Sequence, residues 1–72
     1  MTEAKTLFRE AITAAGSQAK LALAIGTTQS HVSYILTRAK RIPPEVAIAI
    51  DHFTDGKIAK RDLRPDLFGD AA

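Results

Sequence analysis

The side chains with the clearest chemical meaning lie between Thr28 and Arg38, in a segment that contains no carboxylate. Its apolar residues Val32, Ile35 and Leu36 recur at helical spacing, so the other side of this helix is polar. A glutamine bonds bidentately to adenine, and serine or threonine hydroxyls bond several bases. Such side chains on the outer face of a helix are typical of base reading in the major groove. The residues predicted to contact bases are Thr28, Gln29, Ser30, Ser33 and Tyr34.

The charges of the chain are distributed unevenly. Between Glu10 and Glu45 there are four basic residues and no acidic one, a formal charge of +4. The acidic residues gather instead from Asp51 onward. A surface that binds phosphates excludes carboxylates, so this distribution favours a nucleic-acid partner. The residues predicted to contact phosphates are Lys20, Thr37, Arg38, Lys40 and Arg41.

Each of these side chains also has a simpler alternative role. Gln29 and Ser30 suit the first turn of any helix, whether or not it binds a ligand. The ring of Tyr34 can pack on neighbouring helices instead of facing a base. The basic run over residues 38–41 is consistent with an ordinary solvated surface. Their joint position on and beside one helix nevertheless favours contact with DNA.

The first element that must support this helix is an amphipathic helix over residues 4–15. Its apolar face consists of Ala4, Leu7, Phe8, Ala11, Ile12 and Ala15. The outer face is expected to carry Lys5, Thr6, Arg9, Glu10 and Thr13. Gly16 suits the C-cap of this helix, because glycine adopts a left-handed conformation without a Cβ clash.

The centre of the chain predicts two short helices joined by a tight turn. Ser17 is a good N-cap for a helix that Gly26 ends, and Thr28 is a good N-cap for the next one. The small side chain of Ala22 allows the second of these helices to pack across the first. Two short helices this close cannot lie antiparallel, so they cross steeply. The sequence thus predicts a helix-turn-helix over Gln18–Thr37.

A fourth helix is expected to follow the basic run. Pro43 and Pro44 suit its start, where a missing N–H costs nothing, and Asp55-Gly56 suits its end. The predicted core face consists of Val46, Ala49, Ile50 and Phe53.

The end of the chain is expected to fold back on this helix. Lys57-Ile58 is predicted to be extended and is followed by one helical turn over Lys60–Arg64, which Pro65 stops. Leu67 and Phe68 are expected to dock on the core, and one of them is expected to cover Ile48; the alternative is a dimer contact at Ile48 or Leu23. No role is assigned to Leu23, which points away from its own apolar stripe.

These elements make one all-α domain of four to five short helices over residues 1–72. Its core is expected over about residues 3–56, and residues 57–72 form a C-terminal turn and tail. The apolar fraction of 46% is ordinary for a folded domain. A core this small leaves little net stability, so pairing with a second copy would stabilise it.

The chain resembles a known family of regulators. The segment Gln18–Ala22 followed by Ile25–Ser33 is similar to the helix-turn-helix of phage Cro and CI repressors. The wider pattern is closer to the short prophage-type Cro/CI regulators of the YdaS-like family. The motifs that carry this resemblance are Gly16-Ser17-Gln18, Arg38-Ala39-Lys40-Arg41-Ile42-Pro43, Thr54-Asp55-Gly56-Lys57 and Leu63-Arg64-Pro65-Asp66-Leu67-Phe68. The resemblance implies a lambda-repressor-like fold, a phosphate contact by Gln18, and a major-groove position for the predicted base-contacting residues.

Other classes of protein find little support in the composition. The chain has no cysteine, and His31 and His52 belong to separate predicted helices, so neither a metal site nor a cofactor is expected. Without a recognisable nucleophile–base pair or glycine-rich phosphate loop, neither an enzyme nor a small-molecule ligand is expected. No apolar run approaches the ~20 residues of a membrane helix and no signal sequence is visible, so a cytoplasmic protein is expected.

The expected function is that of a transcriptional regulator, a Cro-like repressor that binds double-stranded DNA at a palindromic operator. One short helix offers few base contacts, so a homodimer is expected to bind two half-sites. The alternative is an antitoxin, or another protein-interaction partner, in a prophage toxin–antitoxin module. The polar outer face of the third helix argues against this as the only role, because protein-binding helices usually present large apolar anchors.

Overall fold

The computed structural model describes residues 4–69, which form six helices and no β-strand. The helices are α1 (Ala4–Ala15), α2 (Gln18–Ile25), α3 (Gln29–Thr37), α4 (Pro44–Phe53), α5 (Lys60–Leu63) and α6 (Pro65–Phe68). The predicted all-α class is therefore confirmed for this part of the chain. The first four helices agree with the predicted ranges, and α5 agrees with the helical turn predicted over Lys60–Arg64. Helix α6 is additional to the four or five helices expected.

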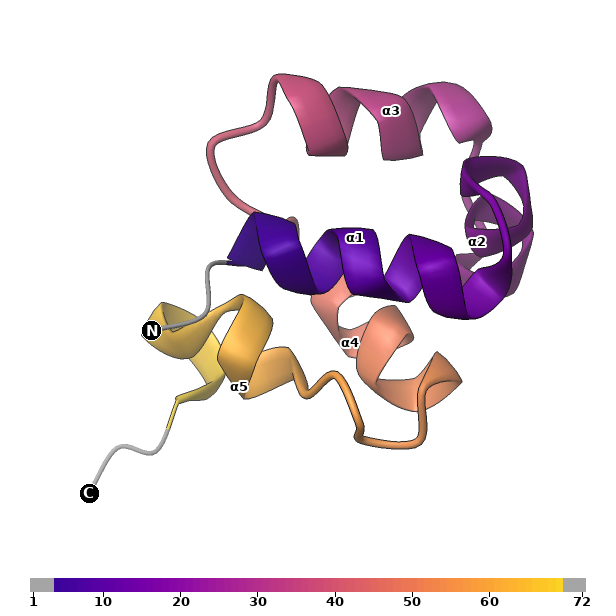
Figure 1. The fold of residues 1–72 in the computed structure, drawn as a ribbon. Coiled ribbons are helices and arrows are strands. Elements are labelled where there is room, and N and C mark those ends of the chain that lie inside the picture. The colour runs from indigo at the N-terminus through magenta and orange to yellow at the C-terminus, as the bar shows by residue number, and fades with distance from the viewer. Residues whose placement is uncertain (1–3, 70–72) are drawn as a thin grey trace.

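The helices pack around α1, which crosses the middle of the molecule (Figure 1). Helix α3 runs antiparallel to α1 on one side of it, and α2 joins the two at one end and crosses both steeply. Helices α4 and α5 lie on the other side of α1 in this view. Contacts between α2 and α4 and between α1 and α5 close the core. The outer side of α3 is thus left uncovered by the other helices (Figure 1).

Local signals explain how α2 and α3 are held at this steep angle. The Ser17 side chain caps α2 by accepting a hydrogen bond from the Lys20 N–H at 3.1 Å. Gly26 ends α2 in the left-handed region, with φ of 75°, and its N–H returns to the last turn of the helix. The Thr27 N–H donates to the Ala22 carbonyl at 2.8 Å. This tight C-cap redirects the chain within three residues, so that α3 can begin at Gln29.

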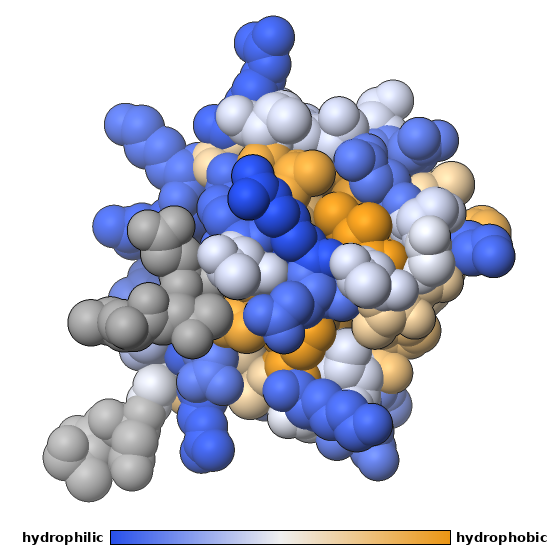
Figure 2. Space-filling view, in the orientation of Figure 1, coloured by the Kyte–Doolittle hydropathy of each residue, from blue (hydrophilic) through white to orange (hydrophobic). Residues whose placement is uncertain are grey.

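One hydrophobic cluster connects five of the helices. Its members are Phe8, Ala11, Leu21, Ala22, Val32, Ile35, Ile42, Val46, Ala47, Ile50, Ile58 and Leu63. Val32 and Ile35 hold α3 from beneath, as the sequence predicts, and Leu21 comes from α2. Hydrophilic side chains cover most of the face seen in Figure 2, and apolar surface is confined to small areas between them.

The predicted core face of α4 is partly wrong. Val46 and Ile50 are buried, but Ala47 completes the stripe, while Ala49 is half-buried and Phe53 remains 40% exposed. The buried stripe is centred between Ala47 and Ile50, which places Phe53, in the last turn, at its margin. Helical spacing alone fits both stripes, because Val46 and Ile50 belong to each of them.

Two polar side chains close the turn after α4. The Thr54 hydroxyl donates to the Ile50 carbonyl at 2.8 Å and accepts from the Ile58 N–H at 3.0 Å. An Asp51 carboxylate oxygen accepts from the Lys60 N–H at 2.9 Å and so caps the start of α5. These contacts fix the connection that brings Ile58 into the core.

The tail also differs from the prediction. Pro65 ends α5 as expected, but it also begins α6, because its fixed φ and missing N–H suit the first position of a helix. Phe68 packs against the core, with the Lys60 ammonium 5.3 Å from its ring centroid. Ile48 remains 45% exposed and Leu67 is exposed, so the expected covering of Ile48 by the tail is wrong. The side chain that docks is Phe68, because α6 directs Leu67 outward.

Candidate nucleic-acid interface

The N-terminal end of α3 is built by a cap that leaves its first residues exposed. Thr28 has extended backbone angles, and its hydroxyl oxygen accepts a hydrogen bond from the His31 N–H at 3.1 Å. This contact uses an acceptor position of Thr28 and leaves its O–H free to donate. Gln29 and Ser30 follow in the first turn, and both are exposed. The structure thus brings Thr28, Gln29 and Ser30 together at one end of α3.

Further along α3, the outward side chains differ in how freely they can act. Tyr34 is 53% exposed, so its ring is not packed away among the neighbouring helices. Ser33 is only half-buried. Thr37 is exposed, but its hydroxyl donates to the Ser33 carbonyl at 2.8 Å. Thr37 can therefore still accept a hydrogen bond, whereas its donor is already used within the helix.

His31 lies at the margin of the α2–α3 turn. Its Nδ1 is 2.8 Å from the Thr27 hydroxyl oxygen, and the ring is half-buried. This contact ties the turn to the first turn of α3, so His31 supports the helix whose outer face was predicted to meet DNA. His52 is exposed in α4. Within residues 4–69, no group of three or more His, Cys, Asp or Glu side chains is placed to hold a metal ion.

The predicted phosphate-binding residues come from three places in the chain. Gln18 and Lys20 lie in the first turn of α2, where Gln18 is half-buried and Lys20 is exposed. Arg38 is the C-cap residue of α3, and its N–H donates to the Tyr34 carbonyl at 2.8 Å. Lys40 follows in the connection to α4. The side chains of Arg38, Lys40 and Arg41 are all exposed, and we call residues 38–41 the basic loop.

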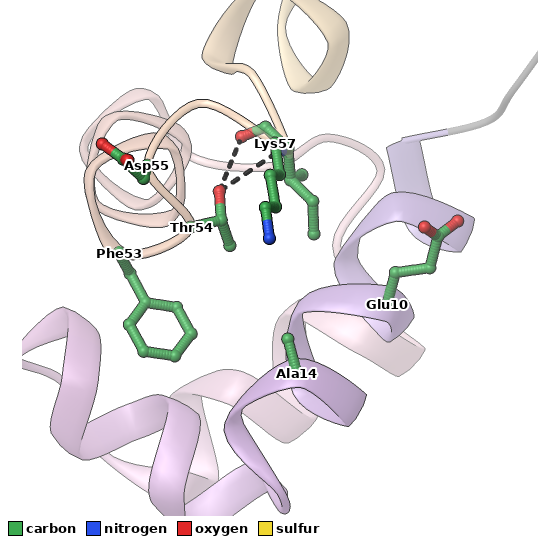
Figure 3. A pocket seen from close by; sticks show the side chains of 7 residues that line it. Glu10, Ala14, Phe53, Thr54, Asp55 and Lys57 are labelled. Carbon is green, nitrogen blue, oxygen red and sulfur yellow. Dashed lines mark hydrogen bonds between the residues drawn. The ribbon is translucent and has the colours of Figure 1, made fainter.

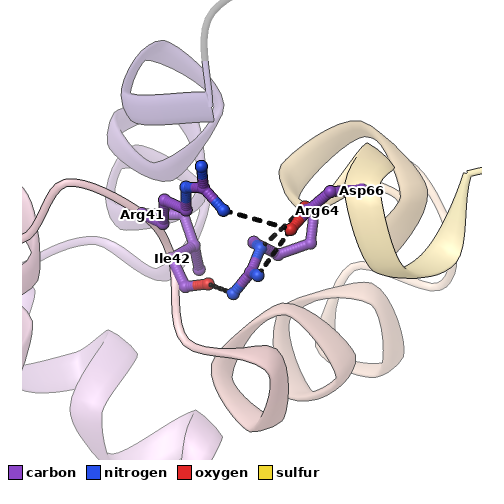
Figure 4. A network of polar contacts seen from close by, with 4 residues as sticks. All are labelled: Arg41, Ile42, Arg64 and Asp66. Atoms are coloured by element: carbon purple, nitrogen blue, oxygen red, sulfur yellow. Dashed lines mark hydrogen bonds and ion pairs between the residues drawn. The ribbon is translucent and has the colours of Figure 1, made fainter.

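Arg41 differs from the other predicted phosphate ligands because a carboxylate lies next to it. One of its nitrogens is 3.4 Å from Asp66, which belongs to α6 (Figure 4). Asp66 is also held by Arg64, whose Nε and terminal nitrogen contact its two oxygens at 2.9 and 2.7 Å. The other terminal nitrogen of Arg64 donates to the Ile42 carbonyl at 2.9 Å. The C-terminal helices are thus fastened to the end of the basic loop.

The electrostatic consequence is strongest for Asp66. The hydrogen bonds from Arg64 lower the pKa of the Asp66 carboxyl from 3.8 to about 2. The same hydrogen bonds raise the pKa of Arg64 above its usual value. Sequence reasoning did not assign either residue to the interface. Asp66 lies 25 residues from Arg41 in the sequence, so no local pattern indicates that these two residues meet.

A pocket of about 550 Å³ lies between α1 and the turn after α4 (Figure 3). It is lined by Glu10, Ala14, Phe53, Thr54, Asp55, Lys57 and Ile58. The ring of Phe53 forms one wall, and the side chain of Lys57 lies across the opening from Ala14 (Figure 3). Its lining residues come from α1, from the end of α4 and from the turn after it, and α4 lies on the other side of α1 from α3 (Figure 1). The pocket is therefore separate from the predicted base-contacting residues.

No helix in the described part of the chain is long and apolar enough to cross a membrane. Comparisons with curated proteins and with solved structures give no significant match. The profile of the family described as bacterial toxin YdaS matches residues 8–72, which is nearly the whole chain. The match includes α2, α3, the basic loop and the motif that contains Arg64 and Asp66. The chain therefore belongs to the bacterial toxin YdaS family.

Proposed function

We propose that this protein is a sequence-specific DNA-binding regulator that inserts α3 into the major groove. The observation that carries this proposal is the outer side of α3, which is exposed, rich in hydrogen-bonding side chains and free of carboxylates. In this arrangement Gln29, Ser30 and Tyr34 read base edges, with Thr28 and Ser33 beside them. An acid-free polar helix face suits the negative potential of a duplex better than the surface of a protein partner.

The dimensions of α3 support this proposal. A helix with its side chains is about 10–12 Å across, which fits the ~12 Å width of the major groove, and the nine residues of α3 extend it for about 13 Å. Helix α2 crosses it steeply at its N-terminal end, where a helix-turn-helix places its first helix. We therefore propose a lambda-repressor-like Cro/CI helix-turn-helix over Gln18–Thr37. Val32 and Ile35 hold the proposed reading helix against the core.

Phosphate contacts would fix the position of α3 in the groove. Lys20 and Gln18 approach from the start of α2, and Arg38 and Lys40 approach from the C-terminal end of α3. Phosphate contacts from α2 and from the loop after α3 would set the register of the reading helix on the duplex without reading the sequence. Thr37 accepts rather than donates in this arrangement, so its proposed contact with a phosphate is made through water.

A homodimer on a palindromic operator follows from the small size of α3. Two or three residues that contact bases discriminate poorly among genomic sites, whereas two copies double the number of contacts. The two reading helices of such a dimer bind half-sites ~34 Å apart. A dimer that occupies a promoter represses transcription without an enzymatic step, as the proposed Cro-like role requires.

The family description favours a second candidate function. It is that of a bacterial toxin, which suggests a place in a toxin–antitoxin module and a protein partner. The large exposed apolar side chains outside α3 include Leu23 on α2, Ile48 and Phe53 on α4, and Leu67 on α6. Exposed apolar side chains of this kind can contact a protein partner in addition to the proposed contact of α3 with DNA. Co-purification with the product of a neighbouring gene, without nucleic acid, would favour this candidate.

Selection of bound duplexes from a random library tests the main proposal. An enriched palindrome with half-sites one helical turn apart supports DNA binding, dimerisation and the spacing at the same time. Fluorescence polarisation over a range of salt concentrations supplies a second measurement, because several phosphate contacts make affinity fall steeply with salt. No enriched sequence together with an affinity insensitive to salt would contradict the proposal.

A further inference from the structure

The C-terminal motif Leu63–Phe68 is connected to the basic loop through Arg64, a half-buried residue. Arg64 has a side chain only 12% exposed, and it joins the Ile42 carbonyl to both oxygens of Asp66. These contacts hold the Asp66 carboxylate in a fixed position beside the loop (Figure 4). A bidentate arginine–carboxylate pair has a defined geometry, so the position of Asp66 does not depend on its contact with Arg41.

The contact between Asp66 and Arg41 is of a different kind. It is a single contact of 3.4 Å between side chains that are 73% exposed for Arg41 and 44% exposed for Asp66. Water and salt screen such a pair, so Arg41 can exchange Asp66 for another anion. A DNA phosphate that approaches Arg41 therefore competes with a carboxylate that Arg64 does not release.

Arg41, Arg64 and Asp66 form a charged cluster at the end of the basic loop, and Asp66 reduces its positive charge. Arg41 and Arg64 contribute two positive charges and Asp66 one negative charge, so the cluster carries +1. We propose that Asp66 restrains Arg41 and so lowers the affinity of the basic loop for the DNA backbone, an inference that rests on the proposed function. Asp66 therefore limits the affinity of the protein for DNA of any sequence. A protein that must find one operator among many sites benefits from such a limit on backbone affinity.

The test compares the wild-type chain with Asp66→Asn in polarisation titrations on a random-sequence duplex at several salt concentrations. Asparagine keeps the shape of the side chain and removes its charge. If Arg41 gains one phosphate contact, the slope of log affinity against log salt steepens by about 0.9. If the two chains bind equally at 1 M salt, this change of slope makes Asp66→Asn bind about eightfold more tightly than the wild type at 0.1 M salt. Circular dichroism confirms that the variant is folded.

Asp55→Asn is the matched control, since it makes the same change in net charge. Asp55 follows the C-terminal end of α4, whereas Arg41 precedes its N-terminal end. A ten-residue helix separates them by about 15 Å, beyond the Debye length of ~10 Å at 0.1 M salt. Asp55 has φ of 55°, a conformation that asparagine tolerates well. We expect Asp55→Asn to leave affinity and salt slope close to those of the wild type.

A double-mutant cycle shows whether the effect passes through Arg41. We expect Asp66→Asn to leave the affinity unchanged in a chain that already carries Arg41→Ala. An equal gain in both backgrounds would overturn the proposal, because the effect would then not depend on Arg41. Equal affinities of the wild type and Asp66→Asn would overturn it as well.

If Asp66→Asn does not fold, single substitutions in the basic loop decide the question. Arg41 is already partly neutralised, so Arg41→Ala should weaken DNA binding less than Lys40→Ala does. An equal or larger loss of DNA affinity for Arg41→Ala contradicts the proposed effect of Asp66. If the wild-type chain shows no salt-dependent binding to DNA, the proposed function is overturned, and the proposed effect of Asp66 is overturned with it. These two failures are distinguished by the wild-type titration alone.

Discussion

The ammonium of Lys5, in the first turn of α1, donates a hydrogen bond to the Leu36 carbonyl, in the last turn of α3, at 3.2 Å. The two residues are 31 positions apart. Carbonyls of a last helical turn lack partners within the helix, and a cation near them also interacts favourably with the helix dipole. This contact ties the C-terminal end of the proposed reading helix to α1, so α3 is held at both of its ends.

Replacing Lys5 by methionine should destabilise the fold by about 1 kcal/mol, because the apolar stem remains but the charged hydrogen bond is lost. For a domain of this size, a loss of 1 kcal/mol lowers the midpoint of thermal unfolding by about 4–8 °C. Lys57→Met is the matched control, since Lys57 is exposed in the turn after α4. Equal midpoints for Lys5→Met and the wild type would show that the contact contributes nothing to stability.

The turn between α2 and α3 depends on the conformation of Gly26. Its φ of 75° lies in the left-handed region, and a Cβ added there would meet no heavy atom within 4 Å. The cost of Gly26→Ala is therefore conformational and not steric, about 1–2 kcal/mol. Gly26→Asn should cost less, because asparagine tolerates this region. Urea unfolding of the three chains measures the difference, and equal stabilities of Ala and Asn variants would contradict this explanation.

The hydrogen bonds between Arg64 and Asp66 predict a dependence of stability on pH. The pKa of Asp66 is lowered from 3.8 to about 2 in the folded chain, so its ionised form stabilises the fold at pH values above about 4. This contribution is lost as the pH falls from about 4 to about 2. Wild type and Asp66→Asn should therefore differ in thermal midpoint at pH 5–7 and converge near pH 2. A difference that stays constant from pH 2 to pH 7 would contradict this assignment.

Most helix boundaries could be predicted because they depend on residues close together in the chain. Ser17 and Thr28 each accept the N–H of the third residue after them, and Gly26 ends its own helix. The buried position of Val32 follows from the spacing within α3, which depends only on its neighbours. Phe53 shows the limit of such reasoning, since which of two overlapping stripes is buried depends on how α4 packs against other helices.

The exposed face of α3 could be predicted for the same local reason, but its surroundings could not. Lys5 looks like an outer-face residue by spacing and is instead half-buried against Leu36. Arg64 bonds the Ile42 carbonyl across 22 residues, and neither sequence pattern nor charge indicates that pair. The expectation that carboxylates avoid the basic segment overlooked Asp66, which the chain brings back to Arg41 through its tertiary fold.

If the basic loop holds phosphates, Lys40→Ala should weaken binding to all duplexes by a similar factor. Lys40 carries an exposed charge beside the C-terminal end of α3 and reads no base in the proposed arrangement. Loss of one phosphate contact makes the slope of log affinity against log salt less steep by about 0.9. Titrations on the selected operator and on a random duplex measure both effects. A loss confined to the operator would place Lys40 at a base instead.

Gln29→Ala should differ from Lys40→Ala by changing sequence preference and leaving the salt slope unchanged, because Gln29 is exposed in the first turn of α3 and lacks a charge. Loss of a bidentate amide contact removes about 1–3 kcal/mol of discrimination at the base pair that it reads. Affinity for the operator should fall while affinity for a random duplex and the salt slope stay as they are. A repeated selection with the variant should then show no preference at one or two positions in each half-site. An unchanged preference at every position would mean that Gln29 serves only the first turn of its helix, and base reading would have to rest on Ser30 and Tyr34.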